Sequence, residues 1–316
     1  MSDQDELGPR LWISGGKVLC GSCAWADRTL VEQAEWYPRR TMTPEQRLRF
    51  YAAQFPLTEI DSTYYAPPSE RQAQLWAERT PLGFRFNVKA YSLLTGHPTR
   101  PGSLWRDLRE ELPAGVLAKR NVYAKHLHSD ALQEAWRRFE SALTPLQDAG
   151  RLGAVLVQYP PWFVPRRENR AEIEALRERL PEYRVCVELR SPRWLAERRD
   201  RERTLALLEE QGLSLVCVDA PEVSGLPRLL THTNPELLVV RFHGRSDSTW
   251  AGSTRSAAER FRYLYTDHEL AQLARPIAEL APEARETHLL MNNCYRDYAV
   301  RNAAELRDLL ARYAGN

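Results

Sequence analysis

The stretch LLVVRFHG at residues 237–244 says more about the fold than any other part of the chain. It begins with four apolar residues and ends in a polar tip that contains Arg241 and His243. A continuous apolar run without alternation is typical of a strand buried on both faces of a parallel sheet. Residues two apart on a strand share a face, so Arg241 and His243 are expected to point the same way.

Seven other short runs resemble this one, and most of them also end in a charged or amide residue. The run VCVELR at residues 185–190, for example, places Glu188 and Arg190 on one face. Because desolvating a charge costs several kcal/mol, ionisable groups at several strand ends predict one shared polar site. We predict strands at residues 18–24, 58–64, 84–90, 154–159, 184–190, 213–219, 237–243 and 287–292.

Helical patterns lie between most of these strands. Thr43 and Ser69 each precede a helix start with Gln at the capping-box position. Further helices are predicted at residues 130–146, 167–180, 200–211, 256–280 and 302–313, and the connection after Asp219 is only weakly helical. Strands alternating with helices predict an α/β fold with a parallel sheet, here a (β/α)8 TIM-type barrel in a single domain. A doubly wound open sheet is the alternative.

Composition narrows the class of protein. Apolar residues make up 43% of the 316 residues and charged residues 27%, which is ordinary for a globular protein. A net charge of +2 indicates no overall attraction to nucleic acid or membranes. The acidic start is unlike a secretion signal, no apolar run is long enough to span a bilayer, and five cysteines suit a reducing compartment. We therefore expect a cytoplasmic protein.

An insertion of approximately residues 95–129 interrupts the regular alternation after the third strand. It is too long for a simple connection between a strand and a helix. Because it follows a strand end, we expect it to lie over the strand tips as a rim or lid.

The strongest candidate site residues are two pairs at strand ends. Glu188 and Arg190 indicate either a carboxylate held ionised at a substrate site or an internal ion pair that closes the barrel. Arg241 is suited to clamping an anion, His243 to moving a proton, and Gly244 to close backbone approach. The alternative for His243 is a hydrogen bond to a backbone carbonyl.

Other polar residues at strand ends are expected to converge on the same site. They are Lys89, Gln158, Asp219, Asn292 and Asn293, together with Asp61, which is expected to share a strand face with Glu59 and Thr63. Asp219 and the two asparagines have an alternative role in capping turns. Trp25, Trp162 and Trp194 follow strand ends and are expected to wall the site. The C-x-x-C pair of Cys20 and Cys23 lacks the context of a redox or zinc motif, so buried small residues are expected there.

Seven segments in order carry a resemblance to a known family. They are GSCAW at 21–25, EIDSTYY at 59–65, FRFNVK at 84–89, VQYPP at 157–161, VELRSPRW at 187–194, RFHG at 241–244, and NN at 292–293 followed by Ala299, Asn302 and Ala303. These are similar to motifs of the family called domain of unknown function 72, the YecE-like proteins. The resemblance implies a TIM-type barrel distantly like those of xylose isomerase and endonuclease IV, and implies no reaction. The chain departs from the family at Asp61, at Cys23 and in the insertion.

The leading functional hypothesis is an enzyme that acts on an anionic, phosphate- or carboxylate-bearing substrate, with hydrolysis or phosphodiesterase activity as the reaction. Arg190, Arg241 and Lys89 would bind charge, and Glu188 and His243 would act as base and acid. Asp219, Gln158, Asn292 and Asn293 would orient the ligand. One alternative is a non-catalytic binder of nucleic acid or a phosphorylated ligand, and another is an aldolase that uses Lys89 as a Schiff base.

We predict no cofactor and no tightly held metal. Arg190 shares a face with Glu188, and Arg241 shares one with His243, so two guanidiniums would repel a dication at this site. No pair of metal-binding histidines ends a strand, since His126 and His128 lie in the insertion. The oligomeric state is left open by the sequence.

Overall fold

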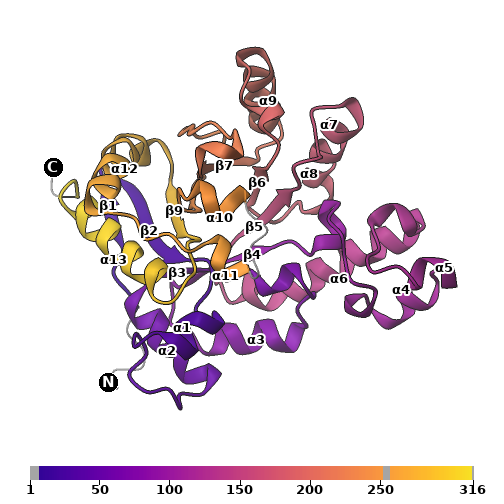
Figure 1. Cartoon of the computed structure of the whole chain (residues 1–316), viewed down its shortest axis with the longest axis horizontal. Helices are drawn as coiled ribbons and strands as arrows, with labels where there is room; N and C mark the ends of the chain where they lie inside the picture. Colours follow the sequence, from indigo (N-terminus) through magenta and orange to yellow (C-terminus); the bar gives the residue numbers. More distant parts are fainter. Residues whose placement is uncertain (1–6, 252–256, 315–316) are drawn as a thin grey trace.

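The computed structural model describes residues 7–251 and 257–314, and its central feature is a closed barrel of parallel strands (Figure 1). Each strand from β2 onward pairs in parallel with the next, and β9 pairs with β2 over six residue positions. This closure confirms the TIM-type barrel and excludes the open sheet. The barrel strands are β2 (Gly16–Ser22), β3 (Leu57–Ile60), β4 (Arg85–Lys89), β5 (Leu152–Tyr159), β6 (Val185–Leu189), β7 (Ser214–Asp219), β8 (Leu237–Phe242) and β9 (Glu286–Met291).

A short strand that the sequence analysis missed precedes the barrel. β1 (Leu11–Ile13) pairs antiparallel with β2, with Ile13 opposite Gly16. Ser14 and Gly15 join them with positive φ values of 45° and 92°. Two such residues in a row are the geometry of a tight hairpin turn, so the Ser-Gly dipeptide was the available signal.

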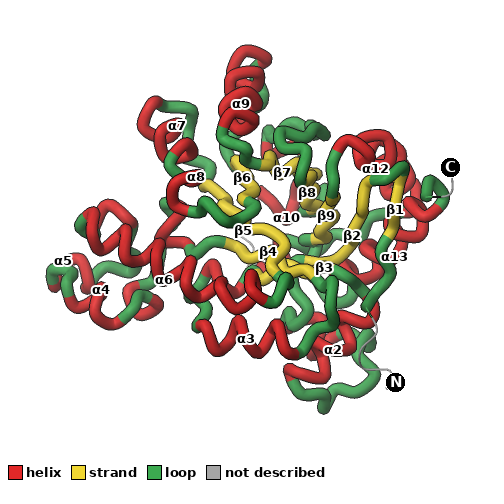
Figure 2. Tube along the Cα trace, turned by 180° about the vertical axis from the view of Figure 1, so that it is seen from behind, coloured by secondary structure: helices red, strands yellow, loops and turns green. Residues whose placement is uncertain are grey.

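Helices surround the barrel on its outside, as Figure 2 shows. Both predicted capping positions are occupied as expected, because Thr43 forms a capping box and Ser69 accepts a hydrogen bond from Gln72 N. The main helices are α1 (Arg28–Gln33), α2 (Pro44–Gln54), α3 (Glu70–Glu78), α6 (Ser129–Asp148), α7 (Arg167–Glu174), α8 (Leu176–Arg179), α9 (Arg198–Glu210), α10 (Asp247–Ala251), α11 (Ala257–Arg260), α12 (Asp267–Leu280) and α13 (Tyr298–Ala311).

Three predicted elements were wrong in their extent. The helix predicted at 256–280 is two helices, α11 and α12, because a capping box at Thr266 starts α12; residue 256 lies outside the described residues. The helix predicted at 167–180 divides at Ala175. The second strand ends at Ile60, and residues 62–64 form a 3-10 turn. Asp61 and Thr63 therefore do not lie on a strand face with Glu59.

Two apolar layers explain why the strands read as continuous apolar runs. Inside the barrel, Leu19, Leu57, Leu156, Cys186 and Val216 belong to one cluster. Outside it, alternate residues of the same strands pack against the helices in a much larger cluster. Both faces of each strand are thus shielded from water, which is the condition that such runs indicate.

The insertion differs from the expected lid. Its helices α4 (Arg106–Glu110) and α5 (Ala114–Leu117) lie beside α6 at the edge of the molecule in both views (Figures 1 and 2). Two hydrogen bonds from Arg138 on α6 to Asp107, of 2.5 and 2.7 Å, hold α4 there. From the insertion, His97 lines the cavity that is described next.

Candidate functional site

A cavity of about 580 Å³ lies at the carboxyl ends of the barrel strands. This is the end of a TIM-type barrel at which active sites occur. Its walls combine charged, amide and aromatic side chains. The polar and aromatic lining residues are Asp61, Tyr64, Tyr65, Lys89, His97, Gln158, Trp162, Arg190, Ser224, Trp250, Arg260, Phe261 and Asn292.

A buried ion network lies inside the barrel around Arg241. Arg241 Nη1 donates to Glu188 Oε2 at 2.5 Å, and Arg241 Nη2 donates to Glu59 Oε1 at 2.6 Å. All three side chains are at most 1% exposed. Burial alone would raise the pKa of Glu188, but Arg241, Arg190 and His243 outweigh it and hold that pKa well below its usual range. Glu188 is therefore an ionised carboxylate bound by cations.

Glu188 has little capacity left to act as a base. Its Oε1 accepts hydrogen bonds from Gln158 Nε2 at 2.9 Å and His243 Nε2 at 3.2 Å, and lies 3.1 Å from Arg190 Nη1. Burial raises the pKa of the second carboxyl, Glu59, even though Arg241 opposes this. The pKa values of the two acids are thus shifted in opposite directions. The cations lower that of Glu188, and burial raises that of Glu59.

His243 also points into this network and does not line the cavity. The Asn292 amide donates to His243 Nδ1 at 2.7 Å, so the imidazole proton is on Nε2, facing Glu188. Burial lowers the pKa of His243 to about 3, with Arg190 contributing. The ring is therefore neutral near pH 7, and its proton is already bound by Glu188.

The charged residues of the cavity wall are the cations Lys89, Arg190 and Arg260 and the carboxylate Asp61. Lys89 Nζ lies 2.7 Å from Asp61 Oδ1 and 4.5 Å from the centre of the Tyr64 ring. The Arg190 guanidinium lies 4.8 Å from the Trp250 ring. Arg190 Nη1 is close to Glu188 but has no hydrogen-bond acceptor with suitable geometry among the described residues. Nη1 itself is buried and faces Glu188, whereas the Arg190 side chain as a whole is 15% exposed and lines the cavity.

Four residues predicted for the site lie elsewhere. Asp219 faces outward, because the alternate residues Val216 and Val218 occupy the inside of β7; it accepts from Tyr265 OH at 2.6 Å and from Arg245. Gly244 N donates to Tyr265 OH. Asn293 Nδ2 donates to Tyr263 O and Asn302 Oδ1, and Trp25 packs edge-on against Trp76 and Phe86.

The predicted residues thus divide into three groups. Lys89, Arg190, Gln158, Asn292 and Asp61 line the cavity. Glu188, Arg241 and His243 belong to the buried network, and Trp25, Asp219, Gly244 and Asn293 belong to the surrounding structure. Trp162 lines the cavity as expected, whereas Trp194 is fully buried and donates to Phe163 O.

Several lining residues were not predicted because they lie in the connections that follow the strands, in loops, 3-10 turns or short helices. His97 is the most informative, since its ring lies between Tyr64 and Trp162 at centre-to-centre distances of 5.1 and 6.1 Å. Burial, Lys89 and Arg190 lower the pKa of His97 to about 4, so it adds a neutral ring near pH 7. Tyr64, Tyr65, Trp250, Arg260 and Phe261 were also missed.

Other features bear on the remaining predictions. Cys20 packs in the outer apolar layer and Cys23 in the inner one, so they do not form a redox pair. Across residues 7–251 and 257–314, no three His, Cys, Asp or Glu side chains gather as a set able to hold a metal ion. In the same part of the chain, no helix is long and apolar enough to cross a membrane.

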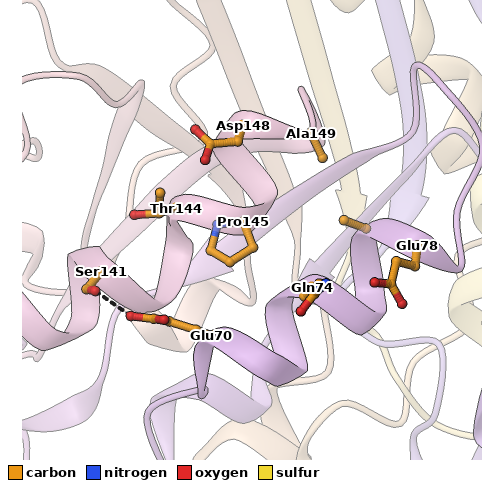
Figure 3. A pocket seen from close by; sticks show the side chains of 9 residues that line it. Glu70, Gln74, Glu78, Ser141, Thr144, Pro145, Asp148 and Ala149 are labelled. Atoms are coloured by element: carbon orange, nitrogen blue, oxygen red, sulfur yellow. Dashed lines mark hydrogen bonds between the residues drawn. The ribbon is translucent and has the colours of Figure 1, made fainter.

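A second hollow lies outside the barrel, between α3 and α6 (Figure 3). Its lining includes three carboxylates, those of Glu70, Glu78 and Asp148, and no basic residue. Ser141 Oγ donates to Glu70 Oε1 at 2.6 Å across it. None of the predicted site residues lies in this hollow.

Comparison with known proteins places the chain in a family. Residues 19–316 match the family described as "Protein of unknown function DUF72". The UPF0759 protein YunF of Bacillus subtilis is 27% identical over 94% of this chain and 96% of its own length. A crystal structure of a DUF72 family protein from Enterococcus faecalis has a TM-score of 0.74 and 25% identity, covering 93% of this chain and 95% of that chain. One from Thermotoga maritima has a TM-score of 0.72 and 29% identity, covering 93% and 98%. The chain belongs to the DUF72 family.

Proposed function

We propose that this protein is an enzyme that hydrolyses a phosphate ester of a small organic molecule bound in the strand-end cavity. The observation that carries the proposal is Arg190. Its side chain lines the cavity and is 15% exposed, so it presents a positive charge there. A phosphate oxygen would bind to this cation, and Lys89 adds a second cation to the same wall.

The chemistry follows from the Asp61–Lys89 pair. The oxygen of a water molecule bonds to phosphorus as the ester P–O bond breaks. Asp61 takes the proton that the water loses, and Lys89 gives a proton to the departing alkoxide. A proton then passes from Asp61 to Lys89 across the 2.7 Å contact between them, which restores the starting protonation state of both groups. Arg190 stabilises the charge on the phosphoryl oxygens throughout.

This assignment changes the roles predicted for Glu188 and His243. Glu188 is bonded to His243 and to Arg241 and lies 3.1 Å from Arg190 Nη1, so Glu188 and His243 act here as positioning residues for Arg190. Lys89 pairs with Asp61, which does not favour the desolvated, unpaired amine that a Schiff-base aldolase needs. Gln158 and Asn292 supply neutral amides that orient the ligand.

Two variants test the proposal. Inorganic phosphate should raise the thermal stability of the native chain, and most of this effect should be lost in Arg190→Gln, because the anion loses the guanidinium that binds it. In Asp61→Asn, phosphate should still bind, while hydrolysis of p-nitrophenyl phosphate should fall by about a hundredfold or more. Arg228→Gln is the matched control, since Arg228 pairs with Asp219 outside the cavity.

Phosphate stabilisation that persists in Arg190→Gln would overturn the anion site. Phosphate binding without hydrolysis, over a panel of phosphate esters, would overturn the enzyme and favour the alternative of a non-catalytic binder. Affinity for single-stranded oligonucleotides that increases steadily with their length would point to a nucleic-acid binder and contradict the small-molecule site.

A further inference from the structure

Three of the large apolar side chains that remain half or more exposed in the described residues line the cavity. In the described part of the chain there are five such residues, Trp12, Tyr65, Leu82, Trp162 and Val223. Tyr65, Trp162 and Val223 all line the cavity, with exposed fractions of 62%, 59% and 50%. Exposed apolar groups that cluster beside a cavity indicate a surface that a ligand covers.

The two parts of the cavity wall differ in chemistry. Lys89 and Arg190 are only 10% and 15% exposed, so these two cations are recessed, whereas a third lining cation, Arg260, is exposed. The aromatic side chains of Tyr65 and Trp162 are far more exposed and form the outer part. A volume of about 580 Å³ is typical of pockets for organic ligands and much more than a lone phosphate requires.

We propose that the ligand is a phosphate monoester whose organic part carries a planar aromatic group, as in a nucleoside monophosphate. The phosphate binds to Arg190 and Lys89, and the planar group stacks on Trp162 and Tyr65. This inference rests on the proposed anion site and adds the class of molecule to which the phosphate belongs.

The aromatic mouth explains the choice of a planar group. Base-on-ring stacking strengthens binding by roughly tenfold per ring, and stacking needs only one exposed ring face. Trp162 and Tyr65 each contact a neighbouring ring at a steep interplanar angle, Trp162 with His97 at 6.1 Å and Tyr65 with Tyr64 at 5.0 Å. These contacts restrict both side chains before a ligand arrives, which favours a rigid planar partner over a flexible alkyl chain.

Three probes and three variants of the full chain test the inference by calorimetric titration. The probes are adenosine monophosphate, ribose 5-phosphate and inorganic phosphate. The native chain should bind adenosine monophosphate at least tenfold more tightly than ribose 5-phosphate. Trp162→Ala and Tyr65→Ala should each weaken the binding of adenosine monophosphate by about tenfold. Each should change the affinities for ribose 5-phosphate and inorganic phosphate by less than about twofold.

Trp12→Ala is the matched control, because Trp12 is 56% exposed on β1 and does not line the cavity. It should bind all three probes as the native chain does. Equal affinities for adenosine monophosphate and ribose 5-phosphate would overturn the planar group and leave the anion site standing. If Trp162→Ala and Tyr65→Ala bind adenosine monophosphate as tightly as the native chain does, the planar group is likewise overturned and the anion site stands. Failure of all three probes to bind the native chain would overturn both proposals.

Discussion

Arg241 is the residue on which the inner end of the site depends. It lies between Glu59 and Glu188, and each of these carboxyls is fully buried. Glu188 in turn contacts Arg190, Gln158 and His243. The cavity residues Arg190 and Gln158 are therefore oriented through a carboxylate that Arg241 keeps ionised.

Replacing Arg241 with Met should destabilise the fold severely. The change leaves two buried carboxyls without their cation, and breaking a buried ion pair on one side costs about 3–5 kcal/mol. Urea denaturation of the native and variant chains measures the loss. Arg198→Ala removes an exposed pair with Glu202 and should cost at most about 0.5 kcal/mol. Equal losses in the two variants would contradict a special role for the network.

At the scale of elements, the turn after β8 leads into a segment that forms part of the cavity wall. Gly244 has a φ of +86°, and a Cβ there would lie 2.6 Å from Tyr263 Cβ. The same turn leads into Arg245, which is anchored by Asp219, and into α10, which brings Trp250 beside Arg190. Gly244 thus does not line the cavity and affects it through the backbone conformation of this turn.

Gly244→Ala should therefore lower both stability and phosphate binding. A side chain in this strained conformation costs about 1–3 kcal/mol, and relief of the clash would move Trp250 relative to Arg190. Urea denaturation and phosphate-induced thermal stabilisation measure the two effects. Gly115→Ala is the control, since a Cβ there meets nothing within 4 Å. A variant Gly244→Ala as stable as Gly115→Ala would show that the turn tolerates a side chain.

At the scale of the whole molecule, buried histidines make stability depend on pH. Burial lowers the pKa of His243 to about 3 and of His97 to about 4, and it also lowers the pKa of His288. The unfolded chain, with an ordinary histidine pKa of about 6.5, then binds more protons than the folded chain below that pH. The free energy of unfolding should therefore fall as the pH drops below about 6.5.

The contribution of His243 can be isolated between pH 6 and pH 5. Each buried neutral histidine adds a slope of up to about 1.4 kcal/mol per pH unit. His243→Gln should reduce the measured slope by roughly 1 kcal/mol per unit in urea denaturation. His268→Gln, which removes an exposed imidazole bonded to Gln272, is the matched control. An unchanged slope in His243→Gln would mean that this ring is not buried in its neutral form.

The architecture of the barrel was predictable because its cause is local. Continuous apolar runs, capping residues at Thr43 and Ser69, and strand–helix alternation each follow from short-range chemistry. The ends of elements were less predictable. The strand that begins at Leu57 ends at Ile60. Beyond it the chain turns, and Thr63 Oγ1 donates to the carbonyl oxygens of Ile60 and of Lys89 on the neighbouring strand.

By itself, the sequence determined that this chain forms a barrel and that polar residues end most of its strands. Only the tertiary structure decided which of them face the cavity. Asp219 and Arg241 both follow apolar runs, yet one points outward and the other inward, because facing depends on pairing with neighbouring strands. Glu188 and His243 are buried and bonded to each other, so they do not line the cavity, whereas a loop places His97 there and α10 places Trp250 there. These outcomes depend on contacts between residues far apart in the chain, which local patterns do not encode.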